Sequence, residues 1–255
     1  MSIMCVGSQF GVAVSDITTG DFEATELVFA DNSEHLINLI GKYLPSEILH
    51  NPAFADTAEY KTILKGFHTS FTQRSEREFS SSAIREDKSF NIMGREKFQD
   101  DELMLCAISA LVSYARETQT GEVMHLKDIR CFKLSETMEL DLTTRLNLEL
   151  TSTIRSKSKK GSLLWAIDRT KTAMGGRLLR KWVEEPLIVT SSINSRLDAV
   201  QEANDKFINR REIMEGLTGL YDIERLAAKV SLGSINAREM ISLRNSLGKL
   251  PFLKE

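Results

Sequence analysis

The strand pattern of this chain stops within one short stretch, and this change constrains the fold more than any other feature of the sequence. Before residue 129, short apolar runs alternate with turn residues and helical segments. After residue 141 every periodic segment is helical. The strands of any sheet must therefore come from the first half. We predict an α/β domain over residues 1–128, a link over 129–140 and a partial helical domain, all-α, over 141–255. A length of 255 residues suits two domains.

The first half predicts a mixed sheet. Three strand-like runs at its start are separated by short turns, which favours an antiparallel meander. These runs are Ser2–Val6, Phe10–Ser15 and Asp21–Phe29. Helices and further strands are expected to follow in the order helix 36–44, strand Glu47–His50, helix Asp56–Lys65, strand Thr69–Gln73 and helix Gln99–Thr118, with Gly121 beyond its end. Residues 74–96 show no clear pattern.

The helices of the second half are expected to begin behind capping side chains. Ser, Thr, Asp and Asn accept hydrogen bonds from the first free amides of a helix. The expected caps are Ser162, Thr172, Ser192, Asp222 and Asn236. Apolar residues follow each cap at helical spacing, so we assign Trp165, Trp182 and Met174, and likewise Met104 of the first half, to the core.

Composition indicates a soluble protein of the cytoplasm. The longest apolar run, Leu103 to Ala115, is too short for the roughly 20 residues of a membrane span, and no secretory signal is visible. The three cysteines are far apart and odd in number, which is typical of buried thiols in a reducing compartment.

Charge divides unevenly between the halves. Residues 1–128 hold 11 Lys+Arg against 20 Asp+Glu, a net of −9, and the remainder holds 22 against 16, a net of +6. The stretch Arg155–Lys160 is expected to be an exposed basic loop, and Arg177, Arg180 and Lys181 form a second basic group around Trp182. Phosphate contacts on DNA are one role for such groups, and helix-to-helix ion pairs are another. A general DNA-binding helical module stays open as an alternative.

An ATP site is not expected within this sequence. A phosphate-binding loop requires the pattern GxxxxGK[ST], which is absent. Gly175-Gly176-Arg177 lies inside a helical pattern with no strand before it.

A metal-dependent nuclease is the enzyme alternative. Asp16 ends the second predicted strand, Asp21 follows the turn, and Glu47 opens a later strand. A meander followed by helix and strand is the strand order of the ribonuclease H-like fold, and two-metal hydrolysis requires several converging carboxylates. Aspartates beside a turn also form local hydrogen bonds, and we favour that interpretation. We therefore predict no catalytic, cofactor-binding or metal-binding residues.

One segment resembles a known family. Residues 163–187 read LLWAIDRTKTAMGGRLLRKWVEEPL, which is similar to the core-domain signature of the MutS DNA mismatch-repair proteins. Leu140-Asp141 with Asn147–Leu150 resembles the segment that opens this domain, and the stretch from Asp16 to Phe22 resembles the hairpin of the family's connector domain. Leu146 and Gly176 depart from residues that the family often has, Arg and Ser respectively.

The resemblance implies that this chain is a fragment of a longer protein. It also implies that the fragment itself catalyses no reaction. It implies a ribonuclease H-like connector domain and the first part of the helical core or lever domain. These would contact the MutL partner and carry conformational signals between the ATP-hydrolysing and DNA-reading parts. ATP, magnesium and mismatched DNA would bind to other domains of the full protein, which is expected to be a homodimer and an ATPase. The family's Phe-x-Glu mismatch wedge is absent from this sequence.

Overall fold

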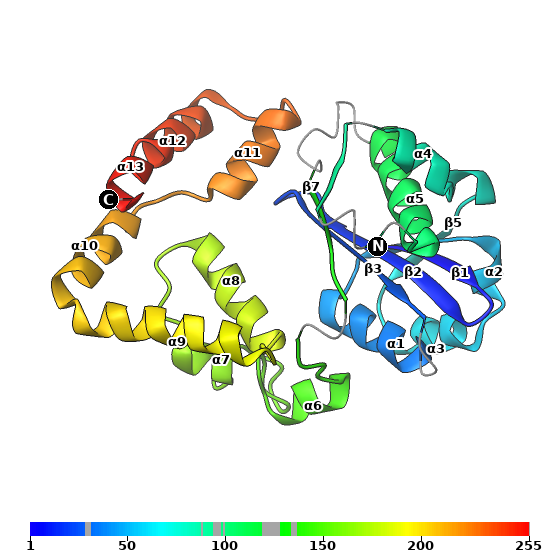
Figure 1. Cartoon of the computed structure of the whole chain (residues 1–255), viewed down its shortest axis with the longest axis horizontal. Coiled ribbons are helices and arrows are strands. Elements are labelled where there is room, and N and C mark those ends of the chain that lie inside the picture. The colour runs from blue at the N-terminus through cyan, green and yellow to red at the C-terminus, as the bar shows by residue number, and fades with distance from the viewer. Residues whose placement is uncertain are drawn as a thin grey trace. The chain divides into compact units, whose positions relative to one another are not determined.

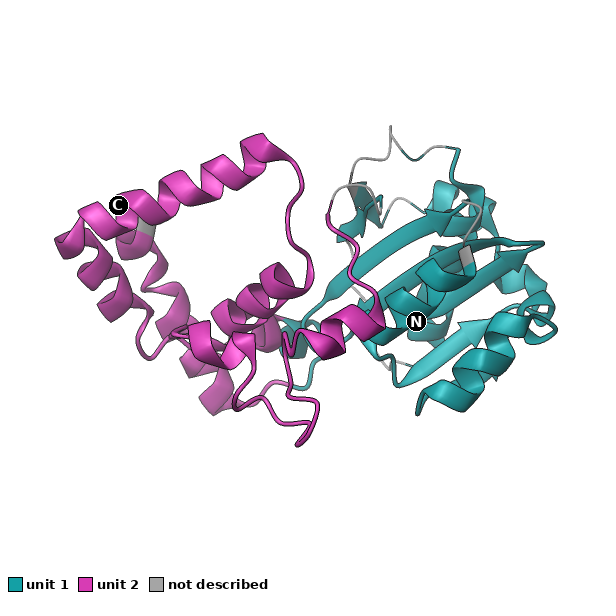
Figure 2. Cartoon of the chain, turned by 90° about the horizontal axis from the view of Figure 1, so that it is seen from below, with its two compact units in different colours: residues 1–133, 228–234 teal, residues 134–227, 235–255 magenta. Residues whose placement is uncertain are grey.

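The computed structural model describes residues 1–28, 32–87, 89–93, 98, 100–118, 128–133 and 137–254. The chain forms two compact units, coloured separately in Figure 2. Unit 1 comprises residues 1–133 and 228–234, and unit 2 comprises residues 134–227 and 235–255. Three predicted boundary residues lie outside the described residues. They are Phe29 at the end of a strand, Gln99 at the start of a helix and Gly121 beyond the end of that helix.

Unit 1 is built on a mixed seven-stranded sheet of order β5-β4-β1-β2-β3-β7-β6. The first three strands form the predicted antiparallel meander, and every other neighbouring pair is parallel. The strands are β1 (Ser2–Val6), β2 (Gln9–Asp16), β3 (Asp21–Leu27), β4 (Glu47–His50), β5 (Ser70–Gln73), β6 (Asn91–Met93) and β7 (Asp128–Cys131). The expected mixed α/β sheet is therefore confirmed, whereas β6 and β7 were not predicted. β7 extends the sheet into the residues assigned to the link.

Helices cover both faces of this sheet (Figure 1). Alternation along β3 places neighbouring side chains on opposite faces. Glu23 accepts a hydrogen bond from Tyr43 of α1 at 2.6 Å, while Glu26 accepts one from the amide of Met104 in α5 at 3.0 Å. The helical segments of unit 1 are α1 (Asn32–Tyr43), α2 (Pro52–Ala55), α3 (Ala58–Gly66), a 3₁₀ turn (Glu76–Glu78), α4 (Ser81–Glu86) and α5 (Glu102–Thr118).

One hydrophobic core of unit 1 lies between α5 and the sheet. Met104 and Ile108 are fully buried against Ala13 and Ala24 of the strands. The prediction that Met104 is a core residue is confirmed.

The start of α5 approaches β2 so closely that only glycine fits at position 11. A Cβ on Gly11 would lie 1.9 Å from the carbonyl oxygen of Leu103 and 2.6 Å from the amide nitrogen of Met104. Both atoms belong to the backbone, so a side chain could not move aside to relieve the clash. Gly11 therefore sets the distance between helix and sheet.

Unit 2 is helical along its described length apart from one isolated β-bridge between Thr137 and Leu187. Its helices are α6 (Leu142–Asn147), α7 (Leu163–Ile167), α8 (Ala173–Glu184), α9 (Thr190–Asp205), α10 (Phe207–Leu217), α11 (Ile223–Ser231), α12 (Ala237–Leu247) and α13 (Leu250–Lys254). The last residues of α11 belong to unit 1. The prediction of an all-α second half is confirmed.

Four of the five predicted caps are in place. Ser162 accepts from the amide of Trp165 at 3.2 Å, Thr172 from that of Gly175 at 3.0 Å, and Asp222 from that of Arg225 at 3.2 Å. Asn236 forms a capping box with Glu239. The fifth prediction was wrong, because α9 begins at Thr190 behind Val189 and places Ser192 within its first turn. Helix α10 was not predicted.

The assignment of both tryptophans to the core was wrong. Trp165 is 49% exposed and Trp182 is 41% exposed. Trp182 instead lies under the guanidinium group of Arg196, which is 4.0 Å from the ring centre. Met174 is half-buried. The apolar face of α8 is thus open along Leu178 and Trp182.

None of the helices in the described parts of the chain combines the length and the apolar character that a membrane span requires.

Candidate functional site

Asp16 is engaged in the β2–β3 turn. Its Oδ1 accepts hydrogen bonds from the amide of Thr18 at 2.8 Å and from the Thr18 hydroxyl at 2.7 Å. Asp21 lies opposite Asp16 in the strand register and accepts from the Thr19 hydroxyl at 2.8 Å. The carboxylates therefore stabilise the turn, as the sequence analysis favoured.

Glu47 also has local partners. Its two carboxylate oxygens accept from the Thr72 hydroxyl at 2.6 Å and from the Tyr114 hydroxyl at 2.9 Å. The hydrogen bond to Glu47 is the largest cause of the raised pKa of Tyr114. Across the residues that the structure describes, no three His, Cys, Asp or Glu side chains come together as a metal-binding group. These observations give the nuclease alternative no support.

The glycine pair of the MutS-like segment is part of a helix. Gly175 and Gly176 lie in the first turn of α8. The amide of Gly175 has no partner within the helix backbone and instead donates to the hydroxyl of the capping residue Thr172. A phosphate-binding loop would present such amides to a ligand after a strand. Here the element that precedes the glycines is the helix α7 and not a strand.

Arg177 is the centre of an ionic cluster between α8 and the start of α11. Its guanidinium donates two hydrogen bonds to the carboxylate of Asp222, at 2.7 and 2.8 Å, and a third to Glu224 at 2.5 Å. The bond from Arg177 is the main reason that the pKa of Asp222 is lowered. Of the two roles considered for this basic group, the structure places Arg177 in the helix-to-helix ion pair. Arg180 pairs with Glu184 in its own helix at 3.1 Å.

The basic loop predicted at Arg155–Lys160 is exposed, as expected. Lys159 forms an ion pair with Asp168 at 2.6 Å. This hydrogen bond and those from Thr170 lower the pKa of Asp168 to about 2. The aspartate of the MutS-like segment therefore anchors one end of the loop.

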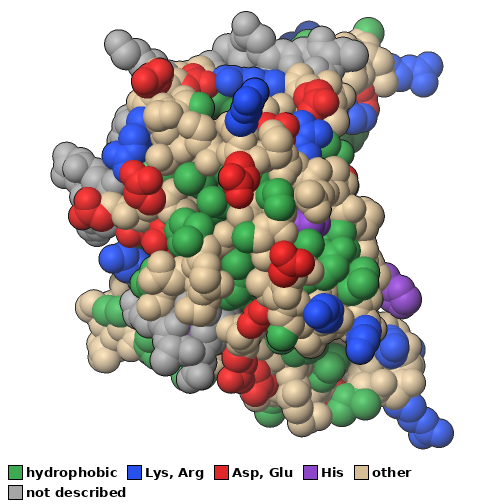
Figure 3. All heavy atoms as spheres, turned by 90° about the vertical axis from the view of Figure 1, so that its right-hand side faces the viewer, with side chains coloured by type: hydrophobic (Ala, Val, Ile, Leu, Met, Phe, Trp, Pro, Cys, Tyr) green, Lys and Arg blue, Asp and Glu red, His purple; other side chains and the backbone are tan. Residues whose placement is uncertain are grey.

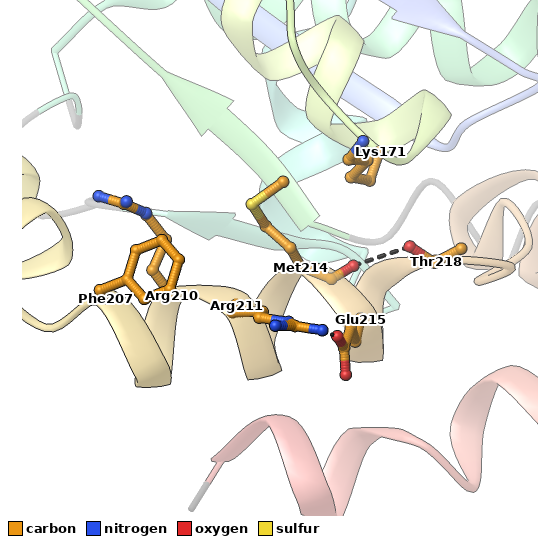
Figure 4. Close-up of a pocket in the computed structure, with 7 residues that line it drawn as sticks. All are labelled: Lys171, Phe207, Arg210, Arg211, Met214, Glu215 and Thr218. Carbon is orange, nitrogen blue, oxygen red and sulfur yellow. Dashed lines mark hydrogen bonds and ion pairs between the residues drawn. The ribbon is translucent and has the colours of Figure 1, made fainter.

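A cavity of about 410 Å³ lies along α10 and was missed by the sequence analysis. Figure 4 shows its lining side chains, most of which project from one face of α10 while Lys171 comes from the segment before α8. The lining residues are Lys171, Phe207, Arg210, Arg211, Met214, Glu215 and Thr218, and we call this surface the α10 groove. The sequence feature that could have predicted this groove is the mixture of apolar and basic residues in 207–218.

The visible face of unit 1 has a mixed surface. Acidic and basic side chains are interspersed there, with hydrophobic side chains scattered between them (Figure 3). Such a surface is typical of a solvated protein exterior.

The three cysteines are poor nucleophiles. Burial is the main cause that raises the pKa of Cys5 to about 11 and that of Cys131 to about 12, and it also raises the pKa of Cys106. Because the thiolate is the reactive form, these side chains are structural at neutral pH.

Comparison with known families matches nearly the whole chain in two consecutive parts. The model of MutS domain II matches residues 1–127, and that of MutS domain III matches residues 143–255.

Curated relatives agree with this assignment. The DNA mismatch repair protein MutS of Acetivibrio thermocellus is 41% identical over 263 residues, and that of Ruminiclostridium cellulolyticum is 43% identical over 260. Both alignments cover 100% of this chain but only 30% and 29% of the relative. MutS of Bacillus pumilus is 38% identical over 246 residues, covering 96% of this chain and 27% of the relative. The chain belongs to the MutS DNA mismatch-repair family and carries that family's domains II and III.

Proposed function

We propose that this chain is the connector and lever part of a MutS-type mismatch-repair ATPase and that it acts by binding and movement. The observation that carries this proposal is the consecutive match to MutS domains II and III on a chain of two units. In this proposal, mismatched DNA, ATP and magnesium bind to other parts of the full protein, which forms a homodimer in the cytoplasm.

We assign the ribonuclease H-like fold to unit 1. Its β1–β2–β3 meander is followed by β4 beside β1 and β5 beside β4, which agrees with that strand order. The local partners of Asp16 and Glu47 support a non-catalytic version of the fold.

The lever role rests on how the helices of unit 2 are joined. Arg177 ties α8 to the first residues of α11 through two carboxylates. Arg145 of α6 donates to the carbonyl oxygen of Glu184 at the end of α8, at 3.2 Å. Ion pairs and hydrogen bonds of this kind allow packed helices to move together as a rigid body. Rigid-body movement transmits conformational signals between distant sites in many proteins.

A pull-down with purified bacterial MutL tests the partner assignment. The immobilised full chain should retain MutL, whereas heat-unfolded chain and an unrelated protein should not. Lysine crosslinking of the retained complex then locates the contact. We expect crosslinks at exposed lysines of unit 1 such as Lys61 rather than at lysines of unit 2 such as Lys206. Absence of retention would contradict the proposed MutL contact.

A nicking assay tests the non-catalytic assignment. The full chain should leave supercoiled plasmid intact in magnesium or manganese. Metal-dependent cleavage that disappears in Asp16→Asn would favour the nuclease instead.

A further inference from the structure

We propose that the α10 groove binds an acidic, amphipathic peptide segment of a partner protein. This inference concerns the described residues of unit 2 and does not depend on the mismatch-repair role. It rests on the shape, the apolar centre and the charge of the groove.

The groove has the size of a binding site and an open apolar centre. Its volume of about 410 Å³ lies within the range of ligand pockets. Phe207 is 61% exposed and Met214 is 42% exposed, so both side chains are available to a ligand. These residues are seven positions apart and therefore lie two turns apart on the same face of α10.

Cations surround this centre on several sides. Arg210 and Arg211 lie between Phe207 and Met214 in the sequence, and Lys171 lies across the groove from α10, on the segment before α8 (Figure 4). The one carboxylate in the lining, that of Glu215, pairs with Arg211 at 2.9 Å. Three cations against one carboxylate leave the groove positive, which favours an acidic ligand.

The same side chains favour a peptide over a nucleic acid. The guanidinium group of Arg210 lies 5.2 Å from the centre of the Phe207 ring, so one face of that ring is already covered. Met214 offers a flexible thioether chain rather than a flat surface for a base. A helix that carries leucine anchors and flanking glutamates matches both the apolar centre and the cationic sides.

A fluorescein-labelled peptide with leucines on one face and glutamates around them is the probe. A length of about 14 residues gives roughly four helical turns. Fluorescence anisotropy with the full chain should detect binding that weakens as salt is added. A second peptide with lysine in place of every glutamate, and a labelled single-stranded oligothymidylate, serve as the other probes.

Substitutions in the groove locate the binding. Met214→Glu should reduce affinity by about tenfold or more, and Lys171→Glu by several-fold, because each replaces an attractive contact by a repulsive one. Leu64→Glu makes the same kind of change at a 54% exposed position of α3, and Lys65→Glu reverses an exposed charge on the same helix. Both controls should bind the acidic peptide as the unaltered chain does. Circular dichroism verifies that every variant is folded. If Met214→Glu does not fold, the test rests on Lys171→Glu, which changes a residue in an exposed loop.

Three results with the peptide probes overturn the proposal. These are no binding of the acidic peptide, equal binding of the acidic and basic peptides, or unchanged binding by the two groove variants. Displacement of the acidic peptide by the oligothymidylate, abolished in Lys171→Glu, would assign the groove to a nucleic acid and would also overturn it.

Discussion

Single residues fix the critical distances in unit 1, and their roles differ in how far the sequence reveals them. Aspartate beside a turn suggests a local hydrogen-bonding role, and Asp16 has that role. Gly11 gives no such signal, because its neighbour Leu103 is 92 positions away in the chain and only the fold brings the two backbones together. Local chemistry is thus readable from the sequence, whereas a tertiary contact is not.

We predict that Gly11→Ala destabilises unit 1 severely. The added methyl group would overlap the backbone of Leu103 and Met104, which forces α5 away from the sheet. A cost of about 3 kcal/mol or more is expected for such overpacking. Gly66→Ala is the control, since a Cβ there meets nothing within 4 Å, and it should change stability by less than about 1 kcal/mol. Thermal unfolding followed by circular dichroism compares the two, and equal melting temperatures would contradict the prediction.

Asp87 makes the stability of unit 1 depend on acid pH. Hydrogen bonds from Ser89, together with one from Arg116 at 2.6 Å, lower the pKa of Asp87 to about 2 from an ordinary value of 3.8. A lowered carboxyl pKa stabilises the fold above the unfolded value, and this stabilisation is lost as the pH falls through the folded value. Asp87→Asn should therefore lower the melting temperature at pH 7, with a difference that shrinks between pH 4 and pH 2. The exposed Asp198→Asn is the control, and a difference for Asp87→Asn that stays constant with pH would refute this prediction.

At the scale of elements, caps were predicted more reliably than apolar patterns. A cap acts within three residues, so Ser162, Thr172 and Asn236 could be identified from sequence alone. Helix α10 has no side-chain cap and follows α9 after the single residue Lys206, so no boundary marked its start. The strand β7 has four residues and exists through its pairing with β3 and β6, which the sequence does not display.

The ion pair between Arg177 and Asp222 should contribute measurably to the joining of α8 and α11. Its two hydrogen bonds are charge-assisted, and the side chains are 30% and 18% exposed. A double-mutant cycle with Arg177→Ala and Asp222→Ala should give a coupling free energy of about 1–2 kcal/mol. The exposed pair Arg211–Glu215, at 71% and 66%, is the control and should give less than about 0.5 kcal/mol. Similar coupling in both cycles would show that the bidentate geometry adds nothing.

At the scale of the whole molecule, the two units differ in how well their apolar residues are buried. Unit 1 has a continuous core beneath α5. Most of the large hydrophobic side chains that are exposed belong to unit 2, including Leu178, Leu197 and Val200. The periodicity that located α8 and α9 was correct, but it gave no information on whether a partner covers those faces.

We therefore predict that the chain self-associates through unit 2. Exposed apolar surface of this extent favours association in water. Sedimentation velocity should show a weight-average sedimentation coefficient that rises with protein concentration. The double variant Leu197→Glu/Val200→Glu should suppress this rise. Leu64→Glu, at a 54% exposed position of unit 1, is the control and should leave it unchanged. A monomer at every concentration would contradict the prediction.

Lys206 is both the C-cap of α9 and the N-cap of α10, so a single residue separates the two helices. A helix of the length of α10 extends about 16 Å, and a rotation of about 10° at its base would displace its far end by about 3 Å. Arg210 spans this joint by donating to the carbonyl oxygens of Ala203 and Asn204. The same arginine lines the α10 groove, so a carboxylate that binds Arg210 there would compete with the hydrogen bonds that connect α10 to the end of α9.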